Sequence, residues 1–223
     1  MLKDREHVSA LLKRGQWFDG LPEKLQELIL DRAVDRSYAK RETIVREGEI
    51  GRGLCAVLEG RVNTVARGGA EREMLIHVAE PGYWFGIFDI LSDGAPRPDT
   101  AYADTNARIL LLSTASFKDI VEMEPRYYPY FAKLLIERYV IVYRFLVDSH
   151  GLPTEEWLHA RLAALAAFRR KDEAGTGPVW VAASQDAIAT MIGVSRQTLS
   201  ILLARLEDRG LIEVGFRGIR ILG

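Results

Sequence analysis

Arg196, Gln197 and Ser200 are polar side chains in the first two turns of a segment that has the pattern of an apolar helix. Leucines recur in this segment at spacings of three and four, which places them on one side of the helix. They are Leu199, Leu202, Leu203 and Leu206. The polar side chains therefore fall on the other side. Arginine can fork onto a guanine and glutamine can pair with an adenine or a phosphate, so this face has the chemistry of base-edge recognition.

Two short helices joined by a glycine turn are predicted to carry this face. Ser184 and Ser195 are each placed to cap a helix start, because a serine hydroxyl can accept a free backbone N–H of the first turn. We expect the first helix to end at Ile192, Gly193 to turn the chain, and the second helix to run to Arg209. That is a helix-turn-helix whose second helix enters the major groove. Hydroxyls and free N–H groups at the two helix starts also favour phosphate oxygens.

A hairpin over residues 211–222 follows and makes the motif a winged one, and Arg217 in its turn is expected to touch the DNA backbone. From Ser184 to Gly223 the chain holds five arginines against four acidic residues, so the segment is only weakly basic. Affinity should then gain from two subunits acting together. The alternative is a small helical domain whose arginine and glutamine are solvated, since glycine corners between helices also occur in proteins that bind no DNA.

A long helix is predicted from about Arg126 to Asp148, after a stop at Pro125. Its apolar residues alternate between spacings of three and four, the seam of a coiled coil, and we expect this seam to pair with a second copy of the helix. The seam consists of Ala132, Leu135, Tyr139, Val142 and Leu146. Because two heptads are short, a plain buried helix would give the same pattern.

Between about Tyr38 and Leu112 the chain consists of short apolar runs separated by glycines, the pattern of β-strands joined by tight turns. Many strands at such regular spacing predict an all-β barrel or roll, with a hairpin at Glu59-Gly60-Arg61. Helical patterning precedes them. The sequence thus predicts an α+β chain with a jelly-roll-like β-roll sensor domain over 1–124, a dimerisation helix and hinge over 125–152, and a winged helix-turn-helix over 153–223.

Composition excludes several classes of protein. The formal net charge is −1 and hydrophobic residues make up 48% of the chain, as in an ordinary folded protein. The single Cys55 cannot form a disulfide framework or an iron–sulfur cluster, and the scattered histidines predict no metal site. No nucleophile elbow, phosphate loop or zinc-protease motif occurs, so we expect no enzyme. With no signal peptide and no membrane span in the sequence, a cytoplasmic protein is expected.

Several separate segments resemble the Crp/Fnr family of bacterial transcription regulators. The run GVSRQTLSILLARLEDRGLI is similar to the family's recognition helix and its entry to the wing, and EGE before LCAVLEGRV, followed by PGYWFG, is similar to the turns of its β-roll. The likeness covers nearly the whole chain in the right order. It implies a cyclic-nucleotide-binding roll, a dimerising helix, a winged helix-turn-helix, a palindromic duplex as ligand, and RNA polymerase as a further partner.

The effector residues follow from that resemblance alone. Family members that bind cyclic AMP hold its phosphate with a glycine and an arginine, which correspond here to Gly86 and Arg97. Ile87 stands in place of the carboxylate that holds the ribose, and Pro98 in place of a hydroxyl that meets the phosphate. The positions on the long helix that face the nucleotide in those relatives are Arg138, Val142 and Tyr143.

These replacements argue against cyclic AMP, because each lost hydrogen bond costs about 1–3 kcal/mol. A cyclic dinucleotide, another anionic ligand, and an unknown signal or none stay open. Asp99 lies two residues after Arg97 on the same strand face and can pair with it, so a surface salt bridge between them is the alternative role for that arginine.

The sequence therefore predicts a homodimeric, sequence-specific transcription regulator. A small effector at the roll and long helix would shift the spacing of two recognition helices, and with it the fit to half-sites about 34 Å apart. The alternative is a ligand-sensing or scaffold protein of the same fold whose DNA binding is degenerate.

Overall fold

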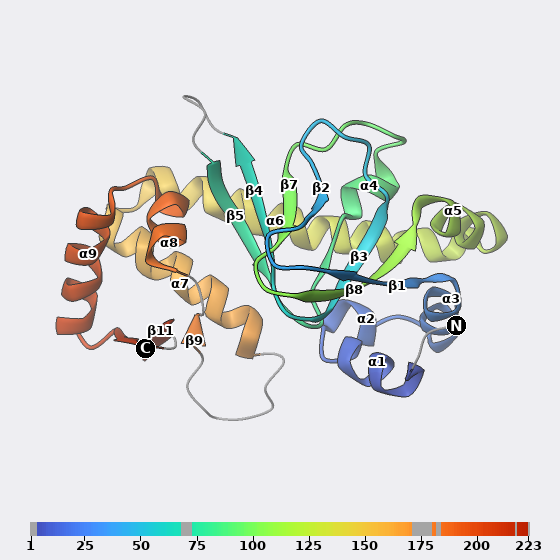
Figure 1. Cartoon of the computed structure of the whole chain (residues 1–223), viewed down its shortest axis with the longest axis horizontal. Helices are drawn as coiled ribbons and strands as arrows, with labels where there is room; N and C mark the ends of the chain where they lie inside the picture. The colour runs from blue at the N-terminus through green and yellow to red at the C-terminus, as the bar shows by residue number, and fades with distance from the viewer. Residues whose placement is uncertain (1–3, 68–72, 171–179, 182–183, 217, 223) are drawn as a thin grey trace. The chain divides into compact units, whose positions relative to one another are not determined.

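The structure is a computed structural model that describes residues 4–67, 73–170, 180–181, 184–216 and 218–222. The chain divides into two compact units, one formed by residues 1–69 and 76–138 and the other by residues 70–75 and 139–223. An α+β architecture was expected, and this is what the structure has (Figure 1). The division falls inside one long helix, so each unit is described by itself.

Two four-stranded sheets form the first unit, as the glycine-separated apolar runs predict. One sheet has the order β1-β8-β3-β6 and the other β2-β7-β4-β5. The strands are β1 (Val34–Tyr38), β2 (Thr43–Val45), β3 (Gly53–Glu59), β4 (Val62–Arg67), β5 (Glu73–Ala79), β6 (Trp84–Phe85), β7 (Thr100–Ala103) and β8 (Ala107–Ser113). The longest pairing is antiparallel, between β3 and β8. Alternating or wholly buried faces on β3, β7 and β8 supply the apolar interior of the roll.

The predicted hairpin at Glu59-Gly60-Arg61 is wrong. β3 and β4 lie in different sheets, so the chain crosses from one sheet to the other at Gly60 instead of folding back on its neighbour. Gly60 has a φ of 77°, and a Cβ there would lie 2.1 Å from the carbonyl oxygen of Asn106. Glycine is needed because the crossing passes against the loop between β7 and β8, not because a tight turn joins paired strands.

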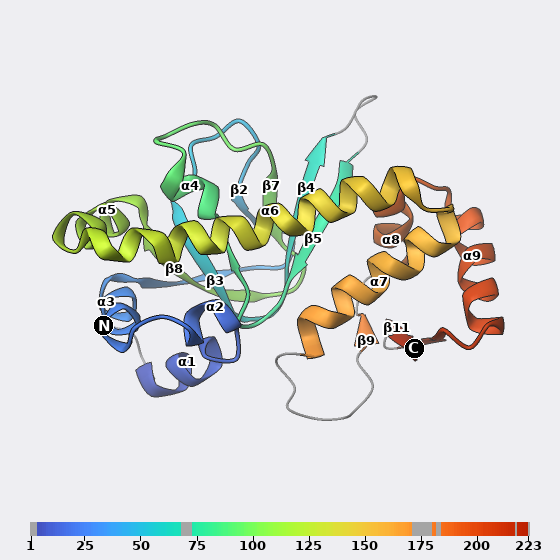
Figure 2. The same cartoon turned by 180° about the vertical axis from the view of Figure 1, so that it is seen from behind.

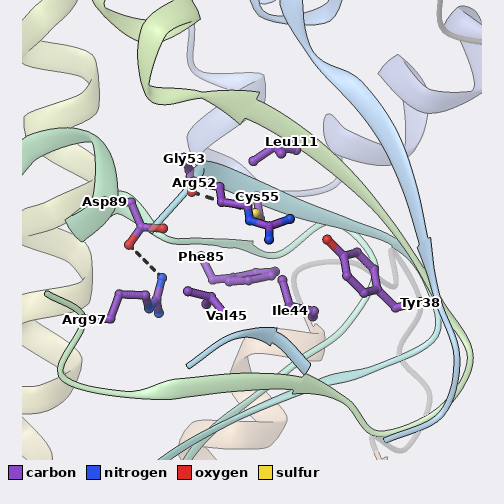
Figure 3. Close-up of a pocket in the computed structure, with 10 residues that line it drawn as sticks. All are labelled: Tyr38, Ile44, Val45, Arg52, Gly53, Cys55, Phe85, Asp89, Arg97 and Leu111. Atoms are coloured by element: carbon purple, nitrogen blue, oxygen red, sulfur yellow. Dashed lines mark hydrogen bonds and ion pairs between the residues drawn. The ribbon is translucent and has the colours of Figure 1, made fainter. Parts of the chain in front are cut away.

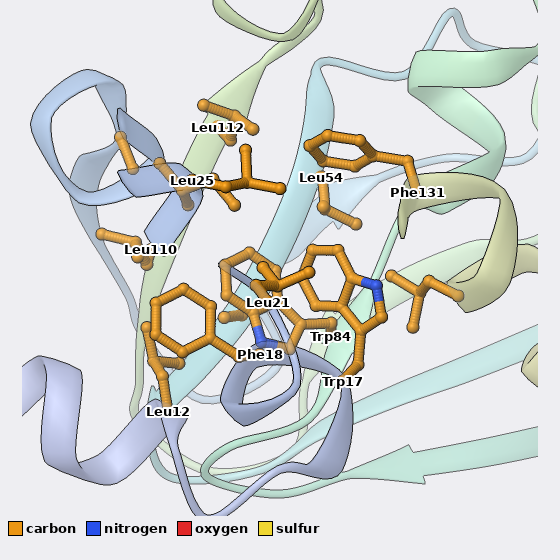
Figure 4. Close-up of a cluster of buried hydrophobic side chains, with 14 of the residues drawn as sticks. Leu12, Trp17, Phe18, Leu21, Leu25, Leu54, Trp84, Leu110, Leu112 and Phe131 are labelled. Atoms are coloured by element: carbon orange, nitrogen blue, oxygen red, sulfur yellow. The ribbon is translucent and has the colours of Figure 1, made fainter. Parts of the chain in front are cut away.

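Helices of the N-terminal segment close one side of the roll. They are α1 (Arg5–Leu12), α2 (Gln16–Asp19) and α3 (Glu23–Arg32). Figure 4 shows their aromatic and leucine side chains gathered around Trp84. Phe18 stacks on Trp84 with ring centroids 5.7 Å apart, and Trp17 meets Trp84 edge-on at 5.1 Å. The Trp17 indole N–H also donates to the backbone carbonyl of Tyr130 at 2.7 Å, which ties this segment to the start of the long helix.

Two short helices and a long one complete the unit, as seen from behind in Figure 2. They are α4 (Ile87–Leu91), α5 (Thr114–Met123) and α6 (Tyr128–Gly151). A 3-10 turn at Pro125–Tyr127 precedes α6, so the helix begins two residues later than expected and continues three residues beyond Asp148. Phe131 and Leu134 of α6 are fully buried in the core of the first unit.

The second unit contains three helices and a small sheet in addition to the end of α6. They are α7 (Thr154–Arg170), α8 (Gln185–Ile192), α9 (Arg196–Asp208), β9 (Trp180–Val181), β10 (Ile212–Gly215) and β11 (Gly218–Ile221). The sheet has the order β10-β11-β9, with both pairings antiparallel. Within the described residues, no individual helix has the length and apolarity to cross a membrane. By those two criteria alone, α8 and α9 meet the requirement only as a bent pair.

Candidate DNA-binding and effector sites

Local signals fix both ends of the turn between α8 and α9. The Ser184 hydroxyl accepts from the backbone N–H of Ala187 at 3.1 Å, and the Ser195 hydroxyl accepts from that of Thr198 at 3.1 Å. Both predicted caps are confirmed. Gly193 ends α8 with a φ of 73°, and the backbone N–H of Val194 donates to the Ala189 carbonyl at 3.0 Å. This is a helix stop that depends on glycine. The two helices are bent by 98° relative to each other, within the range of a helix-turn-helix.

The leucine stripe of α9 is buried as predicted. Its four leucines pack inside the second unit together with Ile188, Ala189, Met191 and Ile192 of α8. Burial of the stripe leaves the opposite face of α9 exposed. This packing, rather than any contact of the polar residues, determines which face of the helix is available for recognition.

The polar residues at the start of α9 are exposed, and most of them already have partners. An Arg196 guanidinium nitrogen lies 3.4 Å from a carboxylate oxygen of Asp186, and both side chains are largely exposed. The Ser200 hydroxyl donates to the Arg196 carbonyl at 3.0 Å, within the helix. Gln197 is exposed. Sequence reasoning missed Asp186, although its position in the first turn of α8, two residues after a serine cap, marks it as solvent-facing.

The wing and the C-terminal end of α9 have their own stabilising contacts. The hairpin of β10 and β11 is present, and Arg220 pairs with Glu213 across it at 2.8 Å. Glu155 of α7 accepts from Arg209 at 2.7 Å and holds the end of α9. Arg217, the expected backbone contact in the turn of the wing, lies outside the described residues, so its part in DNA binding stays a prediction.

The seam predicted on α6 lies on the surface of the single chain. Tyr139 is 59% exposed, Val142, Leu146 and Leu135 are exposed as well, and Ala132 is half-buried. Phe131 and Leu134 lie on the other side of the helix and are buried. The alternative of a helix buried all round is therefore excluded, and a continuous apolar seam remains uncovered.

Figure 3 shows a pocket between the two sheets of the roll. Its enclosed volume is about 10 Å³, roughly the room that one water molecule needs and far below the volume of small-molecule sites. Its lining is mainly apolar, with Asp89 and Arg97 at one end. The lining residues are Tyr38, Ile44, Val45, Arg52, Gly53, Cys55, Phe85, Asp89, Arg97 and Leu111. Burial raises the pKa of the Cys55 thiol to about 12, so this cysteine is a neutral wall residue.

Arg97 does not form a surface salt bridge, which corrects the alternative drawn from the sequence. The residue is 5% exposed and has two acidic partners. Its Nη1 donates to Asp89 at 2.8 Å, and its Nε donates to Asp99 at 2.9 Å with a second contact from Nη2. The expected pairing with Asp99 is confirmed, whereas the pairing with Asp89 was not foreseen.

Two glycines before and at the start of β3 accommodate the Asp89 carboxylate. A Cβ on Gly51 would lie 1.9 Å from the Asp89 carboxyl carbon, and the Gly53 backbone donates to that carboxylate. Burial raises the pKa of Asp89, while the Arg97 guanidinium and the Gly53 hydrogen bond pull it down. Burial alone would lower the pKa of Arg97, but Asp99 and Asp89 outweigh it and the pKa is raised. One buried cation thus faces two carboxylates.

The remaining effector residues are placed as follows. Gly86 begins α4 with a φ of 83°, and a Cβ there would lie 2.5 Å from the Gly53 carbonyl oxygen. Ile87 is buried in the hydrophobic core. Arg138 lies over the ring of Tyr83, 4.1 Å from its centroid. Val142 and Tyr143 belong to the second unit and are exposed.

Two models of known families match the chain. The cyclic nucleotide-binding domain matches residues 35–124, and the Crp-like helix-turn-helix domain matches residues 158–223. Together the matches span most of the chain, in the order of the two sites described above. The chain belongs to the Crp/Fnr family. Crp/Fnr proteins are transcription regulators and not enzymes, and this one binds DNA through its Crp-like helix-turn-helix.

Curated Crp/Fnr relatives match this chain over most of their own length. The chain is 24% identical over 214 residues to the CRP-like cAMP-activated global transcriptional regulator of Mycobacterium tuberculosis, covering 96% of this chain and 95% of the relative. It is 23% identical over 188 residues to the cAMP-activated global transcriptional regulator CRP of Haemophilus influenzae, covering 83% of each.

Solved structures share the fold. FixK2 from Bradyrhizobium japonicum matches with a TM-score of 0.73 at 19% identity, over 86% of this chain and 93% of that one. The global regulator CLP of Xanthomonas campestris matches with a TM-score of 0.71 at 18% identity, over 91% of this chain and all of that one.

The ion pair between Arg196 and Asp186 yields a prediction for this Crp/Fnr regulator. Asp186→Asn should tighten DNA binding about two- to fivefold, because an exposed pair of this kind opposes release of the arginine by at most about 1 kcal/mol. Fluorescence anisotropy with a duplex enriched from a random library measures it. Asp208→Asn removes the same charge from the far end of α9 and should change affinity less. Equal effects of the two variants would show that only net charge matters.

Proposed function

We propose that the protein is a homodimeric regulator whose two α9 helices read successive major-groove half-sites of a palindromic operator. The observation that carries this proposal is that α9 has one buried apolar face and one exposed polar face. A buried leucine stripe fixes the helix, and Arg196 and Gln197 lie exposed in its first turn. Arg196 suits guanine and Gln197 suits adenine or a phosphate. The half-sites would then be about 34 Å apart.

The other residues assigned to DNA contact act on the backbone. Ser184 and Ser195 stand at helix starts, where unpaired N–H groups attract phosphate oxygens. Ser200 still has lone pairs to offer after donating within the helix, and Arg217 completes the wing contact. Because the segment is only weakly basic, specific binding depends on two copies acting together. RNA polymerase as a partner and a cytoplasmic location belong to the same proposal.

Dimerisation is assigned to the seam of Ala132, Leu135, Tyr139, Val142 and Leu146. A second copy of α6 supplies the matching seam with alternating spacings of three and four, and pairing removes these side chains from water. Because α9 follows α6 in the same chain, a signal that alters this pairing can alter the distance between the two recognition helices. That is the allosteric step we propose.

A small effector bound at the roll and α6 is proposed as the signal. The cyclic-nucleotide-binding domain favours a nucleotide, and Gly86, Arg97, Arg138, Val142 and Tyr143 are the residues assigned to it. Two curated relatives are described as cAMP-activated, and the Xanthomonas regulator as c-di-GMP responsive. Here the phosphate of any such ligand must compete with Asp89 and Asp99 for Arg97. That competition weakens every anionic ligand alike, and the packing of Ile87 disfavours cyclic AMP in particular. A cyclic dinucleotide, another anion, and an unknown signal or none are the remaining candidates.

Arg196→Ala tests the DNA-reading role. Loss of the Arg196 guanidinium should weaken binding to the duplex enriched from a random library by roughly tenfold or more per half-site, since a bidentate contact to guanine contributes about 1–3 kcal/mol. Binding to random duplex should persist with a similar salt slope. Anisotropy titrations between 50 and 200 mM salt, roughly the range over which phosphate contacts are resolved, give both quantities. Arg205→Ala, on the same helix, should keep the sequence preference. A wild-type protein that prefers no sequence would instead indicate a ligand-sensing or scaffold protein.

Asp99→Asn tests the competition for Arg97. Removing this charge while keeping a similar shape should tighten the binding of an anionic cyclic nucleotide about tenfold, since a hydrogen bond to a charged group contributes about 1.5–3 kcal/mol. Calorimetric titration of cyclic AMP, cyclic GMP and cyclic di-GMP into the wild type and the variant measures this. Asp104→Asn, which removes a charge paired with Arg61 elsewhere on the roll, is the matched control. Unchanged affinity for all three nucleotides would contradict an anionic effector at Arg97.

A further inference from the structure

One large apolar side chain stands on the exposed face of α9. Successive residues of a helix are about 100° apart, so the buried leucines centre on one side and Gln197, Ile201 and Ala204 centre on the opposite side. Ile201 is 55% exposed. All residues of α9 are described, and none of its other large hydrophobic side chains is exposed.

The position of Ile201 links it to the recognition residues. It follows Gln197 by four residues, one turn further along the same face, and it lies in the N-terminal half of the helix. A solvated surface favours polar side chains at such a position, and β-branched isoleucine has no advantage for the helix itself. The exposed surface of the first two turns therefore presents an amide and a branched apolar side chain on this face, with the Arg196 guanidinium beside it.

We infer that Ile201 contacts the C5-methyl group of a thymine in the operator half-site. In the major groove each base pair shows a distinct pattern, and thymine alone shows a methyl group there. An isoleucine has no donor or acceptor, so beside a guanine or a cytosine it would leave a polar edge without a partner. The inference rests on the proposed function, and it adds a second specified base to the guanine assigned to Arg196.

Helix geometry sets the distance between the two bases. Ile201 follows Arg196 by five residues, which is about 7.5 Å along the helix axis at about 1.5 Å per residue. Base pairs are stacked about 3.4 Å apart. The thymine should therefore lie within about three base pairs of the guanine that Arg196 reads.

Deletion of single methyl groups tests this contact. The duplex that the wild-type protein enriches from a random library is resynthesised with each thymine replaced in turn by deoxyuridine, which lacks only the C5-methyl group. At one thymine near the Arg196 guanine, the replacement should weaken wild-type binding about fourfold per half-site, the value of one buried carbon. Ile201→Ala should lose that sensitivity and keep the response to every other replacement.

Gln197→Ala is the matched control, because it shortens a neighbour on the same face. It should keep the wild-type response at the Ile201 thymine. Ile201→Ala is expected to fold, since it truncates an exposed side chain, and circular dichroism and thermal melting verify this. The inference is overturned if no thymine lies within three base pairs of the guanine, or if Ile201→Ala responds to each replacement as the wild type does.

Failure of the proposed function gives a different result. If the wild-type protein enriches no duplex, sequence-specific binding itself fails and the thymine contact fails with it. If the wild-type protein enriches a duplex in an Arg196-dependent manner but shows no coupling between Ile201 and a methyl group, only the thymine contact fails.

Discussion

An apolar seam that one chain leaves in water is the constraint on which the proposed mechanism depends. On α6 the side facing the first unit is buried through Phe131 and Leu134, while Leu135, Tyr139 and Leu146 are exposed. A continuous exposed apolar patch is unfavourable in water and typically marks a site that a partner covers. In the proposed dimer, a second copy of the same helix covers the seam with its own. The recognition helix of each chain would then act as one half of a pair, which suits a domain with little net positive charge.

The β-roll contains a second constraint of a different kind. Arg97 is buried with two carboxylates, and removing such charges from water is costly unless each is paired. Gly51 makes room for the Asp89 carboxylate and the Gly53 backbone hydrogen-bonds to it, so the start of β3 and the loop before it accommodate this ion cluster. The same guanidinium is the group that would neutralise a phosphate. An anionic signal that binds at Arg97, as proposed above, has to exchange with these carboxylates.

Local signals in the sequence were sufficient for the DNA-binding part. Ser184, Gly193 and Ser195 determine the helix ends through hydrogen bonds within a few residues, and the leucine spacing determines the buried face. The fold class followed in the same way. The pairing of the strands could not be predicted in this way, because the residues around Gly60 resemble a hairpin turn whether or not the flanking strands pair. β1 was missed since its face is exposed and polar. Asp89 could not be found because its pairing with Arg97 depends on a cradle contributed by a separate loop.

The mass of the free protein and of its DNA complex tests the central claim most directly. Sedimentation equilibrium should give twice the 25.1 kDa of one chain for the wild type alone, and the mass of two chains plus that of the duplex for its complex with a palindromic DNA. Leu135→Glu should give the single-chain mass with an unchanged fold, and Met123→Glu, an exposed position on α5, should remain a dimer. A wild-type protein that stays a single chain in solution and binds the palindrome as one copy would contradict the account.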